Sequence, residues 1–118
     1  MNSYQEDNKN MDKYIIEVGT NCKDPAKESE YNEWYNNTHL PDVLETPGLV
    51  RATRYENTNT GEGQAKFLAI YEVETDDIEG YMKISNENVA KLTEAGRISD
   101  LLVFVYMNMY KQTYTLTQ

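Results

Sequence analysis

The chain has little of several residue types from which common functional sites are built. Cys22 is its only cysteine, which excludes an internal disulfide and a zinc site made of several cysteines. His39 is its only histidine, so chemistry near neutral pH that needs an ordinary imidazole depends on this residue. Gly61 and Gly63 lie in a polar turn, and no glycine-rich phosphate-binding motif is present. A nucleotide-binding enzyme is therefore not expected, and neither a metal nor another cofactor is predicted.

Basic residues are also scarce. The 118 residues include 11 Lys and Arg against 20 Asp and Glu, a net charge of −9. Phosphate backbones and anionic membrane surfaces repel such a chain, which excludes nucleic acid and membranes as expected partners. The longest apolar run, Leu101–Met107, is far shorter than the roughly 20 residues of a membrane-spanning helix. Together with the single cysteine, these features predict a soluble cytoplasmic protein.

The length corresponds to one domain. The polar segment 1–10 has no apolar run, so it is expected to be a disordered tail ahead of a single domain over 11–118. Alternating and helical periodicities predict the order β, α, β, β, α, β, an α+β ferredoxin-like fold with an antiparallel sheet. The expected elements are strand 11–18, helix 28–38, strands 49–57 and 65–74, helix 77–95 and strand 101–111.

Two expectations concern the ends and faces of these elements. Pro41 disfavours helical geometry for Leu40, which predicts that the first helix ends near His39 and that a short second turn follows. Leu102, Phe104 and Tyr106 alternate along the last strand and are expected to form an apolar row on the sheet face that no helix covers. A second copy packed against that face would bury the row, so a homodimer is predicted.

Ten tyrosines stand against two phenylalanines and one tryptophan. A tyrosine joins an apolar ring to a hydroxyl, which suits a cavity wall that must hydrogen-bond an oxygen-bearing ligand. Tyr35, Tyr71, Tyr106 and Tyr110 are candidates for such a wall. The alternative is that these rings only fill the core.

The segment W-Y-N-N-T-H-L-P-D-V-L over residues 34–44, followed by Pro47 and Gly48, resembles the EthD-like, dimeric α+β-barrel superfamily. That superfamily carries a W-Y-x-x-x-H-L-P-x-V-L-x-x-P-G run at the end of the first helix, and F-L-A-I-Y-E-V over 67–73 is similar to the third strand of an uncharacterised branch. The resemblance implies a dimer, a small-molecule cavity between sheet and helices in each protomer, and a histidine of the motif that points toward the cavity.

His39 and Tyr35 are four residues apart, so both can lie on one side of the helix end. A helix C-terminus favours the charged imidazole and burial opposes it, which suits a general acid or base. The structural alternative is that His39 only caps carbonyls and positions the Leu40–Pro41 turn.

Arg51 and Arg54 are three residues apart in a strand, so only one of them can face the cavity, where it would hold an oxyanion. An ion pair with Glu72 or Glu17 across the sheet is the structural alternative. Glu72 is either that partner or a second acid or base, and Trp34 is expected to be a packing anchor. The candidate catalytic residues are His39, Arg54 and Tyr35, and the candidate ligand-binding residues are Trp34, Arg51, Tyr71, Glu72, Phe104 and Tyr106.

These residues favour a cofactor-independent enzyme that transfers a proton on a small hydrophobic, aromatic or polyketide-like oxygenated molecule, as a cyclase, dehydratase or isomerase does. The alternatives are a cofactor-free monooxygenase and a non-catalytic binding or dimerisation protein of the same fold. Haem ligation through His39 is a further alternative, although an acidic chain offers few cationic partners for the propionates.

Overall fold

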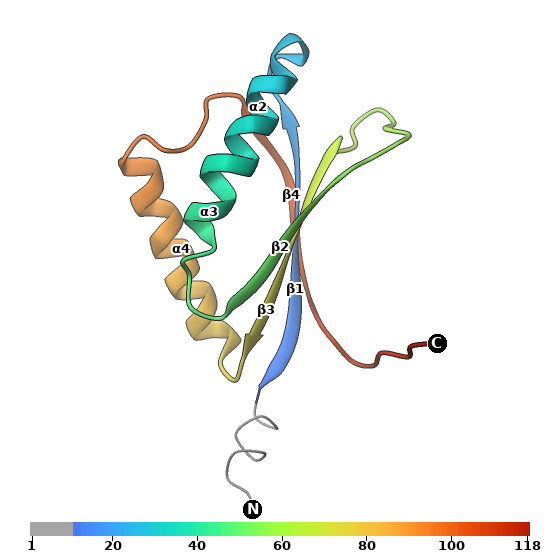
Figure 1. Cartoon of the computed structure of the whole chain (residues 1–118), viewed down its shortest axis with the longest axis vertical. Coiled ribbons are helices and arrows are strands. Elements are labelled where there is room, and N and C mark those ends of the chain that lie inside the picture. Colours follow the sequence, from blue (N-terminus) through green and yellow to red (C-terminus); the bar gives the residue numbers. More distant parts are fainter. Residues whose placement is uncertain (1–10) are drawn as a thin grey trace, which may run out of the picture.

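Residues 11–118 are described by the computed structural model, which has one antiparallel sheet with its helices on a single face (Figure 1). The strand order in the sheet is β2-β3-β1-β4. The elements are β1 (Asp12–Cys22), η1 (Pro25–Lys27), α2 (Glu28–Trp34), η2 (Tyr35–His39), α3 (Leu40–Val43), β2 (Leu49–Glu56), β3 (Phe67–Thr75), α4 (Ile78–Glu94) and β4 (Leu102–Lys111). The predicted α+β ferredoxin-like fold is confirmed, while the predicted tail over 1–10 lies outside the described residues.

The sheet presents one apolar face to the helices. Along β3, Phe67, Ala69, Tyr71 and Val73 are buried and alternate with less buried residues, as the two-residue period of a strand requires. Ile16 of β1 pairs with Tyr71, which brings the helix-facing residues of β1 into the same layer. Tyrosines supply much of the core that completes this layer from the helices, namely Tyr31, Tyr35 and Tyr81.

The expectation that the first helix ends near His39 is wrong. The backbone continues from α2 through the π-helical turn η2 into α3, with Pro41 as the second residue of α3. The N–H of Leu40 donates to the carbonyl of Tyr35, five residues earlier. Proline in a regular α-helix clashes with the carbonyl four residues before it, and the wider turn displaces the carbonyls that Pro41 would meet. The helix therefore passes the proline without a break.

The expectation that Leu102, Phe104 and Tyr106 share the uncovered sheet face is also wrong. Gly19 pairs with Tyr106, but Thr20 pairs with Phe104, so β4 contains a β-bulge at this point. The extra residue reverses the alternation. Phe104 consequently faces the helices, whereas the ring of Tyr106 lies over Gly19 on the opposite face.

Helix α4 is capped at both ends but packs loosely. The Asp77 carboxylate accepts from the N–H of Gly80 at 3.0 Å, and Gly96 takes a positive φ of 74° just beyond the helix. Tyr81 is the only buried residue of α4. The other sheet-facing side chains of α4 therefore border a space between the helix and the sheet.

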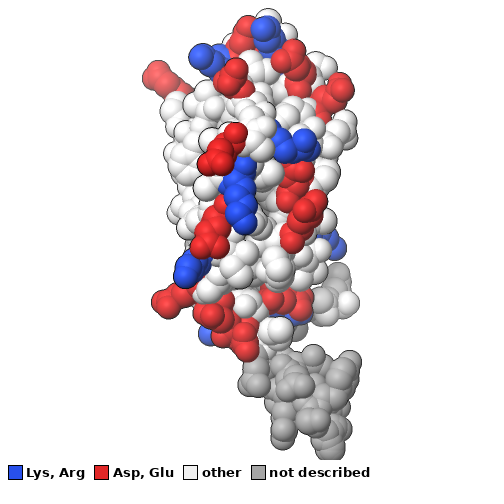
Figure 2. Space-filling view, turned by 90° about the vertical axis from the view of Figure 1, so that its left-hand side faces the viewer, with Lys and Arg blue, Asp and Glu red and all other residues white. Residues whose placement is uncertain are grey.

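The outer surface of α4 is charged. Exposed residues of alternating sign follow at intervals of four along the helix: Glu79, Lys83, Glu87 and Lys91. Figure 2 shows red and blue groups alternating along the length of this face. Such pairs stabilise a helix by a few tenths of a kcal/mol each, so the charges on this surface support the helix.

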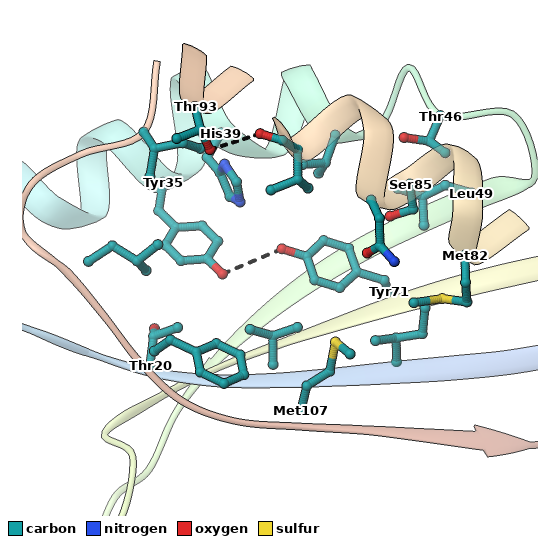
Figure 3. A pocket seen from close by; sticks show the side chains of 18 of the residues that line it. Thr20, Tyr35, His39, Thr46, Leu49, Tyr71, Met82, Ser85, Thr93 and Met107 are labelled. Carbon is teal, nitrogen blue, oxygen red and sulfur yellow. Dashed lines mark hydrogen bonds between the residues drawn. The ribbon is translucent and has the colours of Figure 1, made fainter. Parts of the chain in front are cut away.

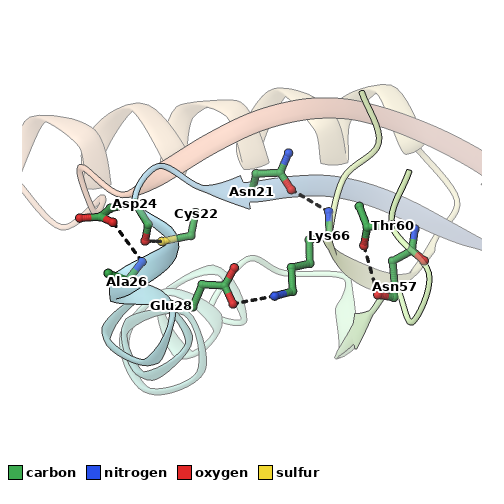
Figure 4. Close-up of polar contacts among 8 residues, drawn as sticks. All are labelled: Asn21, Cys22, Asp24, Ala26, Glu28, Asn57, Thr60 and Lys66. Atoms are coloured by element: carbon green, nitrogen blue, oxygen red, sulfur yellow. Dashed lines mark hydrogen bonds and ion pairs between the residues drawn. The ribbon is translucent and has the colours of Figure 1, made fainter. Parts of the chain in front are cut away.

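Polar contacts fasten the long β2–β3 connection to the rest of the fold. The side chain of Asn21 accepts from the backbone N–H of Lys66 at 2.7 Å, and the ammonium of Lys66 pairs with Glu28 at 2.7 Å (Figure 4). These contacts hold the start of β3 against both the end of β1 and the start of α2. The neighbouring helix turn, which carries Tyr31 and Tyr35, is thereby held over the sheet.

Candidate functional site

A cavity of about 420 Å³ lies between the sheet and the helices. Its lining includes Ile16 and Val18 of the sheet. Figure 3 shows Tyr71 on the sheet side and Tyr35, His39 and Ser85 on the helix side. The volume falls within the range of small-molecule sites. The cavity exists because α4 spans the sheet without filling the space beneath it.

The cavity wall carries no charged side chain among the residues the structure describes, provided His39 is neutral. Its polar groups are hydroxyls of Tyr, Thr and Ser, one amide from Asn86 and the His39 imidazole. A buried ion without a partner is costly, so an uncharged wall favours an uncharged ligand.

His39 is held between aromatic rings. Its imidazole stacks on Trp34 with centroids 4.9 Å apart and meets the edge of Tyr35 at 5.0 Å. The π turn places Tyr35 and His39 at its two ends, and both line the cavity. Nδ1 of His39 is buried and has no hydrogen-bond partner among the described residues.

The surroundings of His39 favour the neutral imidazole. Burial lowers the pKa of His39 below its ordinary value of 6.5, Asp42 acts in the opposite direction, and Arg54 lowers the pKa further. A neutral imidazole has one unprotonated ring nitrogen, which can accept a proton. At neutral pH this group is therefore a base and not an acid.

Two phenolic hydroxyls meet beside the histidine. Tyr35 Oη and Tyr71 Oη are 3.4 Å apart and point toward each other from α2–η2 and from β3 (Figure 3). Burial raises the pKa of both phenols, most strongly that of Tyr71, so both stay protonated at neutral pH. Protonated phenols donate hydrogen bonds, and this pair can stabilise negative charge that develops on a ligand oxygen.

Arg54 lies behind Tyr35 and does not line the cavity. Its Cζ is 4.3 Å from the centre of the Tyr35 ring, and its Nη1 donates to Asn36 Oδ1 at 3.0 Å. Its Nε is buried without a partner among the described residues. The guanidinium thus faces the helices but does not contact the cavity. Its charge acts on the cavity electrostatically, across the ring of Tyr35.

The structure brings together four of the nine candidate residues at the cavity, namely His39, Tyr35, Tyr71 and Phe104. Arg51 and Glu72 lie on the other sheet face, where they form an exposed ion pair of 3.0 Å. Tyr106 lies on that same face. Trp34 packs against His39 and donates from Nε1 to the Arg97 carbonyl at 2.9 Å, outside the cavity wall.

Sequence reasoning missed the polar groups that α4 and the turn before β2 contribute. Thr46, Tyr81, Ser85 and Asn86 all line the cavity. Tyr81 and Ser85 are four residues apart on one helix face, which is the one signal in the sequence that could have joined them. Thr46 gave no signal, because its position depends on how the turn folds back against α4.

The residues of the cavity suit neither a metal ion nor haem. Within residues 11–118, no cluster of three or more His, Cys, Asp and Glu side chains could hold a metal ion. Haem does not fit the wall, because its propionates need cationic partners and no Lys or Arg of residues 11–118 lines the cavity. In the described part of the chain, no helix is long and apolar enough to cross a membrane.

The fold and the cavity define a ferredoxin-like α+β protein with an internal cavity, and solved structures share this fold. HapK from Hahella chejuensis is 13% identical with a TM-score of 0.67, over 89% of this chain and 97% of that one. SnoaB, a cofactor-independent oxygenase from Streptomyces nogalater, is 14% identical with a TM-score of 0.59, over 92% and 98%. An EthD family protein from Bacillus halodurans is 21% identical with a TM-score of 0.52, over 86% and 99%.

The family is shown by sequence. Residues 13–98 match the domain of unknown function DUF4286, and the chain belongs to that family. No functionally curated protein matches the chain. The structural similarities, all at low identity, show the fold and leave the activity to be argued from the site.

Proposed function

We propose that this chain is a cofactor-independent enzyme that transfers a proton on a small, neutral, hydrophobic molecule bearing oxygen. One observation carries the proposal: the only histidine lines a cavity whose wall has no acidic or basic side chain among the described residues, and two phenolic hydroxyls meet beside it. This combination provides a base and a place for the negative charge that proton removal creates.

The reaction that these groups support begins at a carbon next to a carbonyl. The His39 imidazole takes the proton, and the electron pair of the C–H bond moves to the carbonyl oxygen. Tyr35 or Tyr71 donates a hydrogen bond to the resulting enolate oxygen. Return of the proton from His39 to another carbon, or to the opposite face of the same carbon, completes an isomerisation. In a cyclisation, the enolate carbon attacks a second carbonyl of the substrate, and the alkoxide that forms takes the proton back from His39.

The expected pH dependence follows from the lowered pKa of His39. The imidazole is an active base only when neutral, so the rate rises with pH through a value below 6.5 and then stays level near neutrality. The two tyrosines do not limit this plateau, because burial raises the pKa of both phenols.

The first experiment uses 2-tetralone, a neutral bicyclic ketone with acidic protons next to its carbonyl. In D₂O, the protein is expected to speed exchange of these protons above the buffer rate, as followed by proton NMR. His39→Gln is expected to lower the protein-dependent rate by roughly 100-fold or more, the usual contribution of a general base. Binding of 2-naphthol, followed by its fluorescence, should change little.

Lys83→Met serves as the matched control, because Lys83 lies on the exposed surface of α4 away from the cavity. It should exchange protons at the wild-type rate. Exchange that persists in His39→Gln would remove His39 from the role of base.

A cofactor-free monooxygenase uses the same first step, since a substrate carbanion can react with O₂ directly. The similarity in fold to a cofactor-independent oxygenase supports this second candidate. Oxygen consumption measured with the same ketone separates the two activities.

A non-catalytic binding protein is favoured by one detail, the unpartnered Nδ1 of His39. Catalytic histidines are usually oriented by a hydrogen bond to the second ring nitrogen. Tight binding of 2-naphthol without any proton exchange in 2-tetralone would support this reading.

We also propose that two copies pair through the uncovered sheet face, as the resemblance to EthD-like proteins implies. Ile15, Leu68 and Ile70 lie on this face and are only half-buried in the single chain. The segment after β4 runs away from the sheet (Figure 1), and its Tyr114 and Leu116 are 78% and 81% exposed.

A cytoplasmic location stays a prediction from the sequence, to be tested by cell fractionation.

A further inference from the structure

Two hydroxyls lie in the cavity at some distance from the histidine. Thr46, in the turn before β2, is 3% exposed, and Tyr81 of α4 is 6% exposed. Figure 3 shows Thr46 and Ser85 at one end of the cavity, with His39, Tyr35 and Thr93 at the other. Apolar side chains such as Met82 and Leu49 lie near the first group. The cavity therefore has two polar ends.

The turn and the helix hold these two hydroxyls in place. Asn88 Nδ2 of α4 donates to Thr46 Oγ1 at 3.1 Å. Tyr81 packs against the same turn, since its Cδ1 would be 3.1 Å from a Cβ at Gly48. The positive φ of 98° at Gly48 sets the bend that allows this approach. Thr46 and Tyr81 are thus both fixed between the turn and α4.

Each hydroxyl has a proton left to donate. Thr46 Oγ1 already accepts from Asn88, and no described residue accepts the proton of Thr46. Burial raises the pKa of Tyr81, against a smaller opposite effect of Ser85, so the phenol stays protonated at neutral pH. None of the side-chain hydrogen bonds among the described residues involves the Tyr81 hydroxyl, which lines the cavity. Each hydroxyl has one proton and belongs to a residue that lines the cavity, so each can donate to a ligand there.

We infer that Thr46 and Tyr81 form a second ligand subsite, which receives a carbonyl oxygen of a neutral ligand at the end of the cavity opposite His39. A carbonyl oxygen has two lone pairs and no proton, which matches two donors. A carboxylate would lack a cationic partner there, because no charged side chain of the described residues lines the cavity.

The second subsite narrows the class of substrate, and this inference rests on the proposed function. The substrate carries its reacting carbon near His39 and an uncharged carbonyl oxygen at the other end. A ligand without that oxygen leaves two buried donors unpaired, so the site discriminates against it.

The test compares two probes that differ only in this carbonyl: 6-hydroxy-1-tetralone and 5,6,7,8-tetrahydro-2-naphthol. Calorimetry is expected to show that the wild-type protein binds the ketone about tenfold more tightly, the size of one or two net hydrogen bonds. Tyr81→Phe and Thr46→Val should each reduce this preference to about twofold or less, while affinity for the naphthol is kept. Because the same variant is measured with both probes, a partly unfolded sample does not alter the ratio.

Thr93→Val is the matched control. Thr93 also lines the cavity, but its hydroxyl already donates to the Val89 carbonyl at 2.9 Å, so the preference should stay at the wild-type value. Tyr71→Phe removes a hydroxyl near His39, at the other end of the cavity, so the preference for the ketone should be kept in this variant.

A preference that survives in both Thr46→Val and Tyr81→Phe, or that is lost in Tyr71→Phe instead, would overturn the second subsite and leave the proposed function intact. Failure of the wild-type protein to bind either probe at millimolar concentration would contradict the proposed function itself.

Discussion

His39 shows how much a residue depends on its neighbours. The sequence placed it at a helix end, where a cation is favoured, but the structure buries it between Trp34 and Tyr35. Burial outweighs the helix terminus, and so the pKa of His39 is lowered. The same residue that looked equally suited to an acid or a base becomes a base.

Arg54 is expected to act on this base from a distance. Its guanidinium lowers the pKa of His39, after the larger effects of burial and Asp42. Arg54→Met keeps the length of the side chain but removes the charge, so the pKa of His39 should rise toward 6.5. Proton NMR titration of the imidazole measures this directly, because the chain has one histidine and, once any tag is removed, one set of signals.

Arg51→Met is the control for that titration. Arg51 lies on the opposite sheet face in an exposed pair with Glu72, so the midpoint of His39 should not move. Equal shifts in the two variants would mean that Arg54 acts only through the net charge of the protein.

At the scale of elements, two irregularities decide which side chains reach the cavity. The π turn η2 carries the helix past Pro41 and keeps both Tyr35 and His39 on the cavity side. The β-bulge in β4 sends Phe104 to the cavity and Tyr106 to the other face. One extra residue in a helix turn or a strand thus changes which side chains line the cavity.

Gly19 is expected to be required by this bulge. A Cβ at this buried position would overlap the ring of Tyr106. Gly19→Ala should therefore reduce the free energy of unfolding by about 1 to 3 kcal/mol, the usual cost of overpacking. Urea denaturation at fixed protein concentration measures the change.

The same substitution in a Tyr106→Ser background provides the control. With the ring removed, Gly19→Ala should be neutral or slightly stabilising, because alanine costs less backbone entropy than glycine. The same loss in both backgrounds would show that the contact with Tyr106 is not the cause.

At the scale of the molecule, the two faces of the sheet have different surroundings. One face and the helices enclose the cavity, while the other face has no helix over it (Figure 1). Ile70 lies on this second face, in β3, between Glu17 of β1 and Thr53 of β2. It is therefore near the middle of the surface that we propose pairs two copies.

Ile70→Lys is expected to abolish pairing, since burying the ammonium beside Glu17 costs more in lost hydration than the ion pair returns. Light scattering after gel filtration should give about twice the chain mass of 13.7 kDa for the wild type and the single-chain mass for the variant. Ala90→Lys adds the same charge on the exposed side of α4 and should leave the mass unchanged. A wild-type protein that elutes as a single chain would contradict the proposed dimer.

By itself, the sequence determined the order of strands and helices, the ferredoxin-like fold and the histidine of the site. These features depend on hydrophobic periodicity, on helix capping and on the termination of helices and strands by Gly and Pro, all of which act over a few residues. The Asp77 cap and the Gly96 stop of α4 are of this kind.

Only the tertiary structure decided which side chains share the cavity. Contacts between segments distant in the chain turn Arg54 toward the helices and Tyr106 away from them. A contact of the same kind joins Thr46 to Asn88. A β-bulge or a π turn costs little free energy locally, so the packing of the whole chain decides where it forms. Local sequence patterns therefore do not predict its position.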